Sequence, residues 1–399
     1  MAKQSEEQSL REYGNRKKRY KKRKKIIIWT LLLVLIAAGI VYLWTLYNKD
    51  YTSYDTIKTV ENASENALGY FRYEDSIVSY SKDGAVAVDK DGGLLWNGSY
   101  EMMDPIADTC GDYVVVADRG SKLIKTYDKT GEVGSIDTLY DIIKVEIAAQ
   151  GVVVALMEDG ETNYIKLYYP EGTMPSDSEE EDVLAEKETN VNKEGYPVDI
   201  SISDDGEKLV VSYLSVTKGE VISEVSFYNF GEVGQNLTDR FAGGYEFKDM
   251  VVPRVAFLDN NTACAFKDDG IVIFSMSEIP NVIHEETYES KIKSILYSGK
   301  YTGVVLDKDG ATEKQLLLYD LSGNMVLDCK LNFEYSSILL TEKEIIMYDN
   351  LSCVVMKLNG TEKFRYTFDA NIDAFYPINE LDRYFLVSDK KISEIMLVE

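Results

Sequence analysis

Residues 319–327 read YDLSGNMVL, and a turn of this kind, repeated along the chain, decides the fold. The tyrosine ends one apolar run, the Asp and Gly mark a tight turn, and a second apolar run follows at once. Gly supplies the positive φ that such turns require, and a short turn between apolar runs is typical of a β-hairpin. The same pattern returns as VDKDGGLLW (88–96), YDKTGEV (127–133) and KLNGTEKF (357–364), and more loosely as YYPEGTM (168–174) and YNFGEVG (228–234).

Outward from these turns, the chain after Asp50 consists of short β-branched and aromatic runs between Gly, Asp and Asn, without helical periodicity. Runs that resemble the second strand of a repeated unit start at successive spacings of 36, 39, 57, 53, 39, 44 and 39 residues, at Ile77, Tyr113, Val152, Leu209, Thr262, Tyr301, Ile345 and Tyr384. A period of about 40 residues with four short strands per unit is typical of a β-propeller. We therefore predict an all-β propeller over residues 56–399, with eight blades, or seven if one unit is absorbed into a long blade.

The two long spacings and the two ends of the chain also have an interpretation. Residues 175–195 contain DSEEED and few apolar residues, which predicts an acidic loop insertion in the third unit. An extra stretch at residues 231–250 lengthens the fourth unit. The last segment, residues 384–399, supplies only two strands, so Thr56–Asn62 is expected to add the missing outer strand and close the ring.

A long apolar segment precedes the repeats. Residues 26–47 read IIIWTLLLVLIAAGIVYLWTLY and contain no Asp, Glu, Lys or Arg. As a helix these residues measure ~33 Å, enough to cross a hydrocarbon core of ~30 Å. A cleaved signal peptide is the alternative, but its apolar region is shorter and its small residues follow that region, whereas Ala37, Ala38 and Gly39 lie inside it. We therefore expect one retained transmembrane helix.

The orientation of this helix follows from its basic flank. Arg16–Lys25 holds nine basic residues in ten. The positive-inside rule then predicts a cytoplasmic tail at residues 1–25, a linker at residues 48–55 and an extracytoplasmic propeller, in a single-pass protein of the cell membrane. Arg16–Lys25 is also expected to contact anionic lipid headgroups of the inner leaflet.

Charge is distributed very unequally between these parts. Residues 1–25 carry 11 Lys and Arg against 3 Asp and Glu, and the rest of the chain carries 32 against 65, a net charge of −33. An outer part this acidic repels phosphates, so nucleic acid is excluded as its partner.

Catalytic and cofactor motifs are missing from the sequence. His284 is the only histidine, so a multi-histidine metal site is impossible, and we interpret it as a surface residue. No Walker loop, GxGxxG or CxxC occurs. The four cysteines, Cys110, Cys264, Cys329 and Cys353, are interpreted as free thiols, with Cys329–Cys353 as the one disulfide considered. We predict no catalytic residues and no cofactor.

Two acidic turns have a possible metal interpretation. Asp89-Lys-Asp91-Gly and Asp307-Lys-Asp309-Gly each place two carboxylates two residues apart before a Gly. Calcium loops use that spacing, but they also need further oxygen ligands that neither copy shows. Asp-Gly is an ordinary hairpin turn, and we prefer that interpretation to calcium binding.

The basic run, the apolar segment and the YD-x-x-G turns together resemble a bacterial family of single-pass membrane proteins with an outer propeller. That family occurs mainly in Gram-positive, clostridial-type anaerobes and has no assigned activity, so the resemblance implies none here. The repeat is also similar to WD40-like and quinoprotein-like propellers. However, no Trp-Asp dipeptide ends the units, and Trp96 is the only tryptophan outside residues 26–47, so a quinone cofactor is not expected.

Three functions are compatible with these features. The first is a non-catalytic binding or scaffold module that holds an envelope protein or polymer, and we favour it because catalytic constellations are missing. The second is an enzyme that uses carboxylates or a metal on a propeller face. The third is a sensor that couples an outer signal to a cytoplasmic partner.

Overall fold

The computed structural model describes residues 22, 24–25, 28–39, 41, 49–61, 66–172, 183–307, 313–379 and 381–399. The chain forms two compact units, one of residues 1–50 with Glu399 and one of Tyr51–Val398. In the first unit residues 28–39 are helical. None of the helices in the described ranges is both long enough and apolar enough to span a bilayer. The predicted transmembrane segment 26–47 and the tail 1–25 lie partly outside the described residues.

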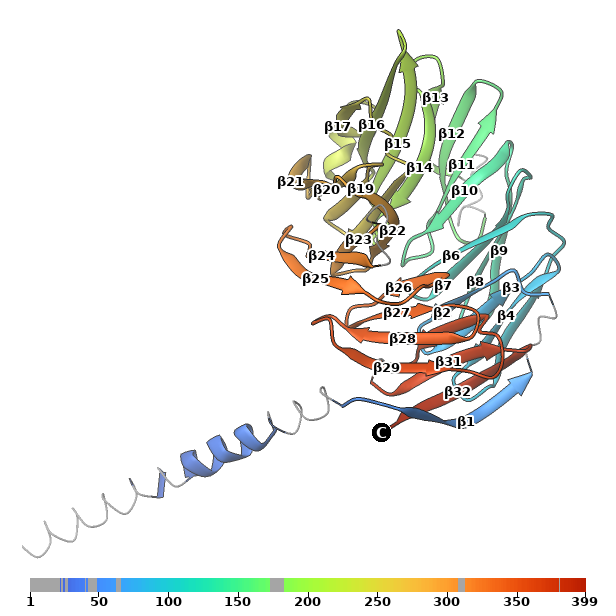
Figure 1. Cartoon of the computed structure of the whole chain (residues 1–399). Helices are drawn as coiled ribbons and strands as arrows, with labels where there is room; N and C mark the ends of the chain where they lie inside the picture. The colour runs from blue at the N-terminus through green and yellow to red at the C-terminus, as the bar shows by residue number, and fades with distance from the viewer. Residues whose placement is uncertain are drawn as a thin grey trace, which may run out of the picture. The chain divides into compact units, whose positions relative to one another are not determined.

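The second unit is an eight-bladed propeller within the part of the chain that the structure describes (Figure 1), which confirms eight blades rather than seven. Each blade is a four-stranded antiparallel sheet. Blades 1 to 4 contain β2 (Gly69–Tyr73), β3 (Ser76–Tyr80), β4 (Gly84–Asp89) and β5 (Leu94–Ser99); β6 (Pro105–Cys110), β7 (Tyr113–Asp118), β8 (Leu123–Asp128) and β9 (Gly131–Asp137); β10 (Asp141–Ile147), β11 (Val153–Asp159), β12 (Thr162–Tyr168) and β13 (Val183–Asn190); and β14 (Tyr196–Ile202), β15 (Lys208–Thr217), β16 (Glu220–Asn229) and β17 (Phe241–Lys248).

Blades 5 to 8 continue the same order. They contain β18 (Arg254–Asp259), β19 (Thr262–Phe266), β20 (Gly270–Met276) and β21 (Pro280–Thr287); β22 (Lys291–Tyr297), β23 (Tyr301–Asp307), β24 (Lys314–Asp320) and β25 (Met325–Leu331); β26 (Ser337–Leu340), β27 (Glu344–Tyr348), β28 (Ser352–Lys357) and β29 (Glu362–Thr367); and β30 (Ala374–Pro377), β31 (Arg383–Ser388), β32 (Lys391–Val398) and β1 (Ser53–Glu61). Two short 3₁₀ helices, η1 (Val233–Asn236) and η2 (Thr238–Arg240), precede β17.

The ring closes by pairing the two ends of the propeller, as the sequence predicts. β1 is the outer strand of blade 8 and pairs antiparallel with β32, from Ser53 opposite Val398 to Glu61 opposite Lys391. Thr59 Oγ1 and Ser393 Oγ lie 3.0 Å apart across this pair. Blade 8 therefore joins the first and last strands of the ring.

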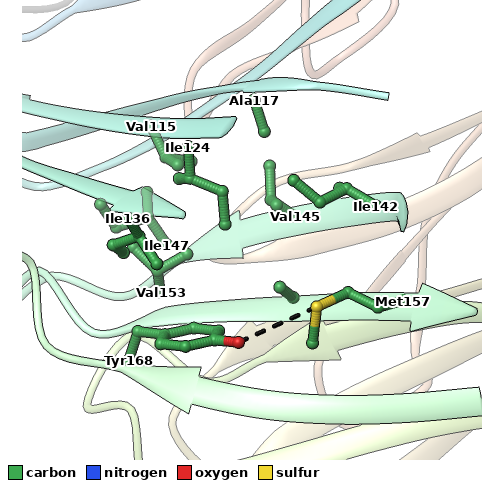
Figure 2. Packing of buried hydrophobic residues seen from close by; sticks show 11 residues of the cluster. Val115, Ala117, Ile124, Ile136, Ile142, Val145, Ile147, Val153, Met157 and Tyr168 are labelled. Carbon is green, nitrogen blue, oxygen red and sulfur yellow. Dashed lines mark hydrogen bonds between the residues drawn. The ribbon is translucent and has the colours of Figure 1, made fainter. Parts of the chain in front are cut away.

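The hydrophobic core lies between neighbouring blades. The second strand of a blade is buried on both faces, as in β7 (YVVVAD), whereas the outer strand alternates buried and exposed residues, as in β5 (LLWNGS). Figure 2 shows the core between blades 2 and 3, where β-branched residues of β7 and β8 meet those of β10 and β11. Tyr168 on β12 donates a hydrogen bond to Met157 Sδ at 3.8 Å. The apolar side chains of these strands therefore pack in a layer between neighbouring blades.

The repeated turn joins the third and fourth strands of a blade, and its Asp closes it. Asp320 Oδ1 accepts hydrogen bonds from Ser322 N at 2.8 Å and Asn324 N at 2.9 Å. Asp128 Oδ1 accepts from Thr130 N at 2.7 Å in the equivalent turn of blade 2. The Asp of YD-x-x-G is thus a turn cap, which satisfies backbone donors that the strands leave unpaired.

In blades 2 and 6, residues of the same repeat pack on the outer strand of the preceding blade. Tyr127 stacks on Trp96 of β5, with ring centroids 4.7 Å apart. Tyr319 lies beside His284 of β21, with centroids 5.1 Å apart. Gly323 has φ +78°, and a Cβ there would lie 2.4 Å from His284 Cβ. One tight turn therefore supplies both the hairpin and the blade-to-blade contact.

The predicted acidic loop at residues 175–195 is wrong for residues 183–190. Residues 183–190 form β13, the outer strand of blade 3, which pairs with β12. Backbone hydrogen bonds along one edge hold this polar strand, so it does not need an apolar pattern. Residues 175–182 lie outside the described residues.

The two faces of the ring differ in the segments that they carry. Successive strands of a meander run in opposite directions, so successive turns alternate between the faces. We call the face with the turns between second and third strands, and with the links between blades, the connection face. The opposite face, which carries the YD-x-x-G turns, is the hairpin face.

Candidate functional site

The two acidic turns do not meet in the structure. Asp89 and Asp91 lie on the hairpin face of blade 1, whereas Asp307 ends β23 on the connection face of blade 6. Asp89 Oδ1 accepts a hydrogen bond from Gly93 N at 2.6 Å and so closes its own turn. Asp309 lies outside the described residues. Across the described ranges no group of three or more His, Cys, Asp or Glu side chains could hold a metal ion. The interpretation of both sequences as ordinary hairpin turns, preferred to calcium binding, stays a prediction.

His284 is a packing residue more than a surface residue. Its side chain is 24% exposed and lies between Tyr319 and Gly323 of the next blade. It occupies the place that Trp96 has between blades 1 and 2, so a histidine ring takes the part of that tryptophan between blades 5 and 6. The four cysteines, Cys110, Cys264, Cys329 and Cys353, are free.

Hydrogen bonds tie together the inner strands of blades 2 to 5, which wall the central channel. In each bond a side-chain oxygen of one blade accepts a backbone N–H of the next blade. The bonds join Asp108 Oδ2 to Ile147 N (3.0 Å), Glu146 Oε2 to Ile202 N (3.1 Å), Asp199 Oδ2 to Val255 N (2.9 Å) and Ser201 Oγ to Phe257 N (3.0 Å). Three acids and one serine therefore connect blades 2 to 5.

Two cations pair with Glu146 and Asp199 of this row. Lys144 Nζ lies 2.6 Å from Asp199 Oδ1 and 2.8 Å from Glu146 Oε1. Arg254 Nε lies 3.6 Å from Asp199 Oδ2. Burial opposes the charge on Lys144, but the carboxylates of Glu146 and Asp199 outweigh it and raise the pKa of Lys144. Paired in this way, the charges stiffen the channel wall.

The pKa of Asp108 is shifted far from its ordinary value. Burial first, and then the negative charge of Glu146, raise the pKa of Asp108 to about 7. Its hydrogen bond from Ile147 N and the charge of Lys144 act in the opposite direction and do not overcome these effects. The Asp108 carboxyl is thus held partly protonated at neutral pH.

Two cavities open on the connection face over blades 7, 8 and 1. Cavity A, of about 450 Å³, is lined by Asn66, Leu68, Tyr70, Tyr348, Asp373, Tyr376 and Lys390, among others. Cavity B, of about 520 Å³, is lined by Glu334, Tyr335, Ser336, Asp349, Asn350, Leu351, Ser352 and Thr367. Because Tyr348 lines one and Asp349 the other, the cavities lie side by side. Each lies within the ~300–1,000 Å³ of typical small-molecule sites.

Side chains at the wall of cavity A are fixed by contacts between blades. Tyr376 Oη, on β30, donates to Tyr70 O, on β2, at 2.8 Å. Burial raises the pKa of both Tyr348 and Tyr376, which keeps these hydroxyls neutral. Burial and the nearby Asp389 raise the pKa of Asp373. The cavity therefore offers neutral aromatic rings and hydroxyls beside one carboxyl.

None of these site residues follows from the sequence pattern alone. Lys144 and Glu146 interrupt the apolar run DIIKVEI, and such charges inside an inner-strand run are a signal that could have pointed to the channel. The residues of the cavities lie at strand ends and on the links between strands, in segments that read as ordinary turns and strand ends. Their proximity depends on how blades 7, 8 and 1 meet.

Comparison with solved structures finds the same fold at low sequence identity. BamB from Moraxella catarrhalis matches with a TM-score of 0.50 and 12% identity, over 86% of this chain and 100% of that chain. The C-terminal WD40 domain of Sif2 matches with a TM-score of 0.56 and 12% identity, over 88% of this chain and 99% of that chain. At such identity the similarity shows the propeller fold alone.

Comparison with sequences gives one family. No curated protein matches the chain. The model of a family of unknown function, DUF5711, matches residues 47–397, which include nearly the whole propeller. Because that match covers far more than half of its length, this chain belongs to the family of unknown function DUF5711.

Proposed function

We propose that this protein is a membrane-anchored, extracytoplasmic propeller that binds an envelope protein or polymer without chemical turnover. The proposal rests on a difference between the channel wall and the connection face. Asp108, Glu146 and Asp199 of the channel wall are engaged in blade-to-blade bonds, whereas cavities A and B open to solvent on the connection face. A stiff ring with recesses on one face suits binding better than catalysis.

The anchor belongs to the same proposal. Residues 26–47 are apolar and uncharged, and Arg16–Lys25 is strongly basic. A helix there would cross the membrane once, with residues 1–25 in the cytoplasm and Arg16–Lys25 against anionic lipid headgroups. Protease added to intact cells should then degrade the propeller and leave a small N-terminal fragment. Protection of the whole chain would contradict this topology.

Capture of partners tests the binding role. The full chain, held in lipid nanodiscs, is incubated with solubilised envelope extract, and bound protein and polymer are identified by mass spectrometry and sugar analysis. We expect one class of partner to be enriched reproducibly over empty nanodiscs. Repeated recovery of nothing above that control would overturn the proposal.

An enzyme is the second candidate, because the Asp108 carboxyl favours it. With a pKa of about 7 this group is suited to donate a proton near neutral pH. Envelope polymer is incubated with the full chain or with Asp108→Asn, and soluble fragments are measured over time. Release that Asp108→Asn abolishes would favour an enzyme, and no release by either protein would favour the binding role.

A further inference from the structure

Cavities A and B, lined by the chain neighbours Tyr348 and Asp349, are here called the recess, and the two have similar chemistry. The polar groups of the recess are mostly uncharged hydroxyls and amides, from Tyr70, Tyr348, Asn350, Ser352 and Thr367. The carboxylate of Asp349 is engaged in its own turn, where it accepts from Leu351 N at 2.8 Å and Ser352 N at 2.6 Å. The recess therefore offers many neutral donors and acceptors and few free charges.

Aromatic rings stand at the wall of both cavities. Tyr70, Tyr348 and Tyr376 border cavity A, and Tyr335 borders cavity B. Tyr335 Oη donates to Ser294 Oγ at 2.9 Å, and Lys293 Nζ lies over one face of the ring, 4.6 Å from its centroid. Both contacts hold the ring in place and leave its other face for a ligand. A fixed ring presents an apolar face to a ligand, while hydroxyls nearby present hydrogen bonds. A ligand that fits must alternate apolar patches and hydroxyl groups.

Charge narrows the choice of ligand further. Residues 26–399 carry a net charge of −33, which opposes an anionic polymer. At cavity A the charged groups are Asp373 and Lys390, with Asp389 beside Asp373, so the local charge is small. Exposed apolar side chains are restricted to Leu68 and Leu351, too few for a lipid chain. Neither an anionic nor a purely apolar ligand is matched.

We propose that the recess formed by cavities A and B binds a neutral saccharide chain. The CH faces of sugar rings would lie on the tyrosine rings, and their hydroxyls would bond to Asp373, Asn66 and Asn350. Because Tyr348 and Asp349 separate the cavities, a chain of several sugars spans them and one sugar does not. This inference rests on the proposed binding function and names the class of its ligand.

Binding of defined sugars tests the inference. The full chain in lipid nanodiscs, free of sugar detergents, is titrated with chitotetraose, cellotetraose and maltotetraose, and with the matching disaccharides, by calorimetry. We expect at least one tetrasaccharide to bind, and at least tenfold more tightly than its disaccharide. No binding by any of the three tetrasaccharides, or equal affinity of both lengths, would overturn the proposal.

Variants locate the site. Asp373→Ala in cavity A and Asn350→Ala in cavity B should each weaken tetrasaccharide binding about tenfold, the loss expected when a hydrogen bond worth ~1.5 kcal/mol is removed. Asp141→Ala is the matched control, because Asp141 is an exposed acid at the start of the inner strand of blade 3. Its affinity should stay within twofold of the unmodified chain. Binding that survives both cavity variants would contradict this site.

Two further outcomes separate this inference from the function on which it rests. If the full chain captures envelope partners and both cavity variants capture them equally, the saccharide site is wrong and the binding function stands. If an uncharged peptide of Gly, Ser and Ala binds and the cavity variants weaken it as they should weaken sugar binding, the recess is a peptide site and the saccharide proposal fails. If the unmodified chain captures no envelope partner at all, the proposed binding function is wrong.

Discussion

Single residues of the repeat have two roles that the sequence shows only in part. Gly323 and Gly120 have nearly the same backbone angle, with φ +78° and +75°. A Cβ at Gly120 would meet nothing within 4 Å, whereas one at Gly323 would lie 2.4 Å from His284 Cβ. Gly120 is needed only for its turn, whereas Gly323 is also needed for the contact between blades 5 and 6. The two positions therefore separate backbone strain from packing.

We predict that Gly323→Ala destabilises the propeller more than Gly120→Ala. Both variants place an alanine at positive φ, which costs ~1–2 kcal/mol. Gly323→Ala should add a further ~1–3 kcal/mol of overpacking against His284. Urea unfolding of both variants measures the difference. Equal losses would show that the turn against His284 opens easily.

Asp108 gives a prediction about pH. Its carboxyl has a pKa of about 7 in the folded chain, against an ordinary value of 3.8. Between these values the folded state holds a proton that the unfolded state has released, so this group's contribution is largest below about pH 4 and is lost as the pH rises toward 7.

Asp108→Asn should remove this loss of stability. Its amide oxygen can still accept from Ile147 N, but it carries no charge to bury. We expect the variant to be more stable than the unmodified chain at pH 8, by on the order of 1–3 kcal/mol, and the difference to shrink toward pH 4. Urea midpoints at several pH values measure this difference. Asp141→Asn, which replaces an exposed acid, should show no such trend.

At the scale of the element, turns and strand starts were predictable and one outer strand was not. The YD-x-x-G copies lie between third and fourth strands, and the starts expected at Ile77, Tyr301 and Ile345 fall in or at the edge of β3, β23 and β27. These strands are buried on both faces, so their apolar runs are visible in sequence. β13 (VLAEKETN) can be polar, because backbone pairing with β12 holds it in place. Its composition alone therefore predicted a loop.

The turn caps can be tested by comparing two aspartates. Asp320→Ala should cost ~1–3 kcal/mol, because two backbone N–H groups lose their acceptor. Asp91→Ala should change little, because among the residues that the structure describes it is Asp89, and not Asp91, that accepts the backbone hydrogen bond closing the turn of blade 1. Thermal unfolding measures both variants.

Calcium dependence is the complementary measurement on the same turns. If Asp89 and Asp91 only shape a hairpin, adding calcium or a chelator should leave the melting temperature unchanged. A rise with calcium that Asp91→Asn abolishes would support the metal interpretation of this turn instead.

At the scale of the whole molecule, the number of blades and the closure of the ring followed from the period of the sequence. The cavities did not, because they arise where the links of blades 7, 8 and 1 meet, and no periodicity encodes that meeting. The hydrogen bonds between inner strands were predictable only in part. Spacings of 39 and 56 residues join their partners, close to the repeat lengths, but only the structure shows which acid faces which backbone donor.

Covalent closure of the ring should stabilise it. Thr59 and Ser393 are direct partners across β1 and β32. A disulfide in the double variant Thr59→Cys, Ser393→Cys would close a very long loop, for which the expected gain is ~2–4 kcal/mol or more. The melting temperature should be higher in oxidising than in reducing buffer. Thr59→Cys alone should show no difference between the two buffers.

The pairing of the first strand with the last in blade 8 also sets an order of events during synthesis. β1 leaves the ribosome among the first parts of the propeller, yet its partner β32 is completed only at Val398. Until then β1 is an unpaired edge, open to wrong partners, and the other seven blades form an incomplete arc. Final assembly must therefore wait for the last residues, and a chain that stalls or is cut just before them would be an aggregation hazard rather than a slightly shorter protein.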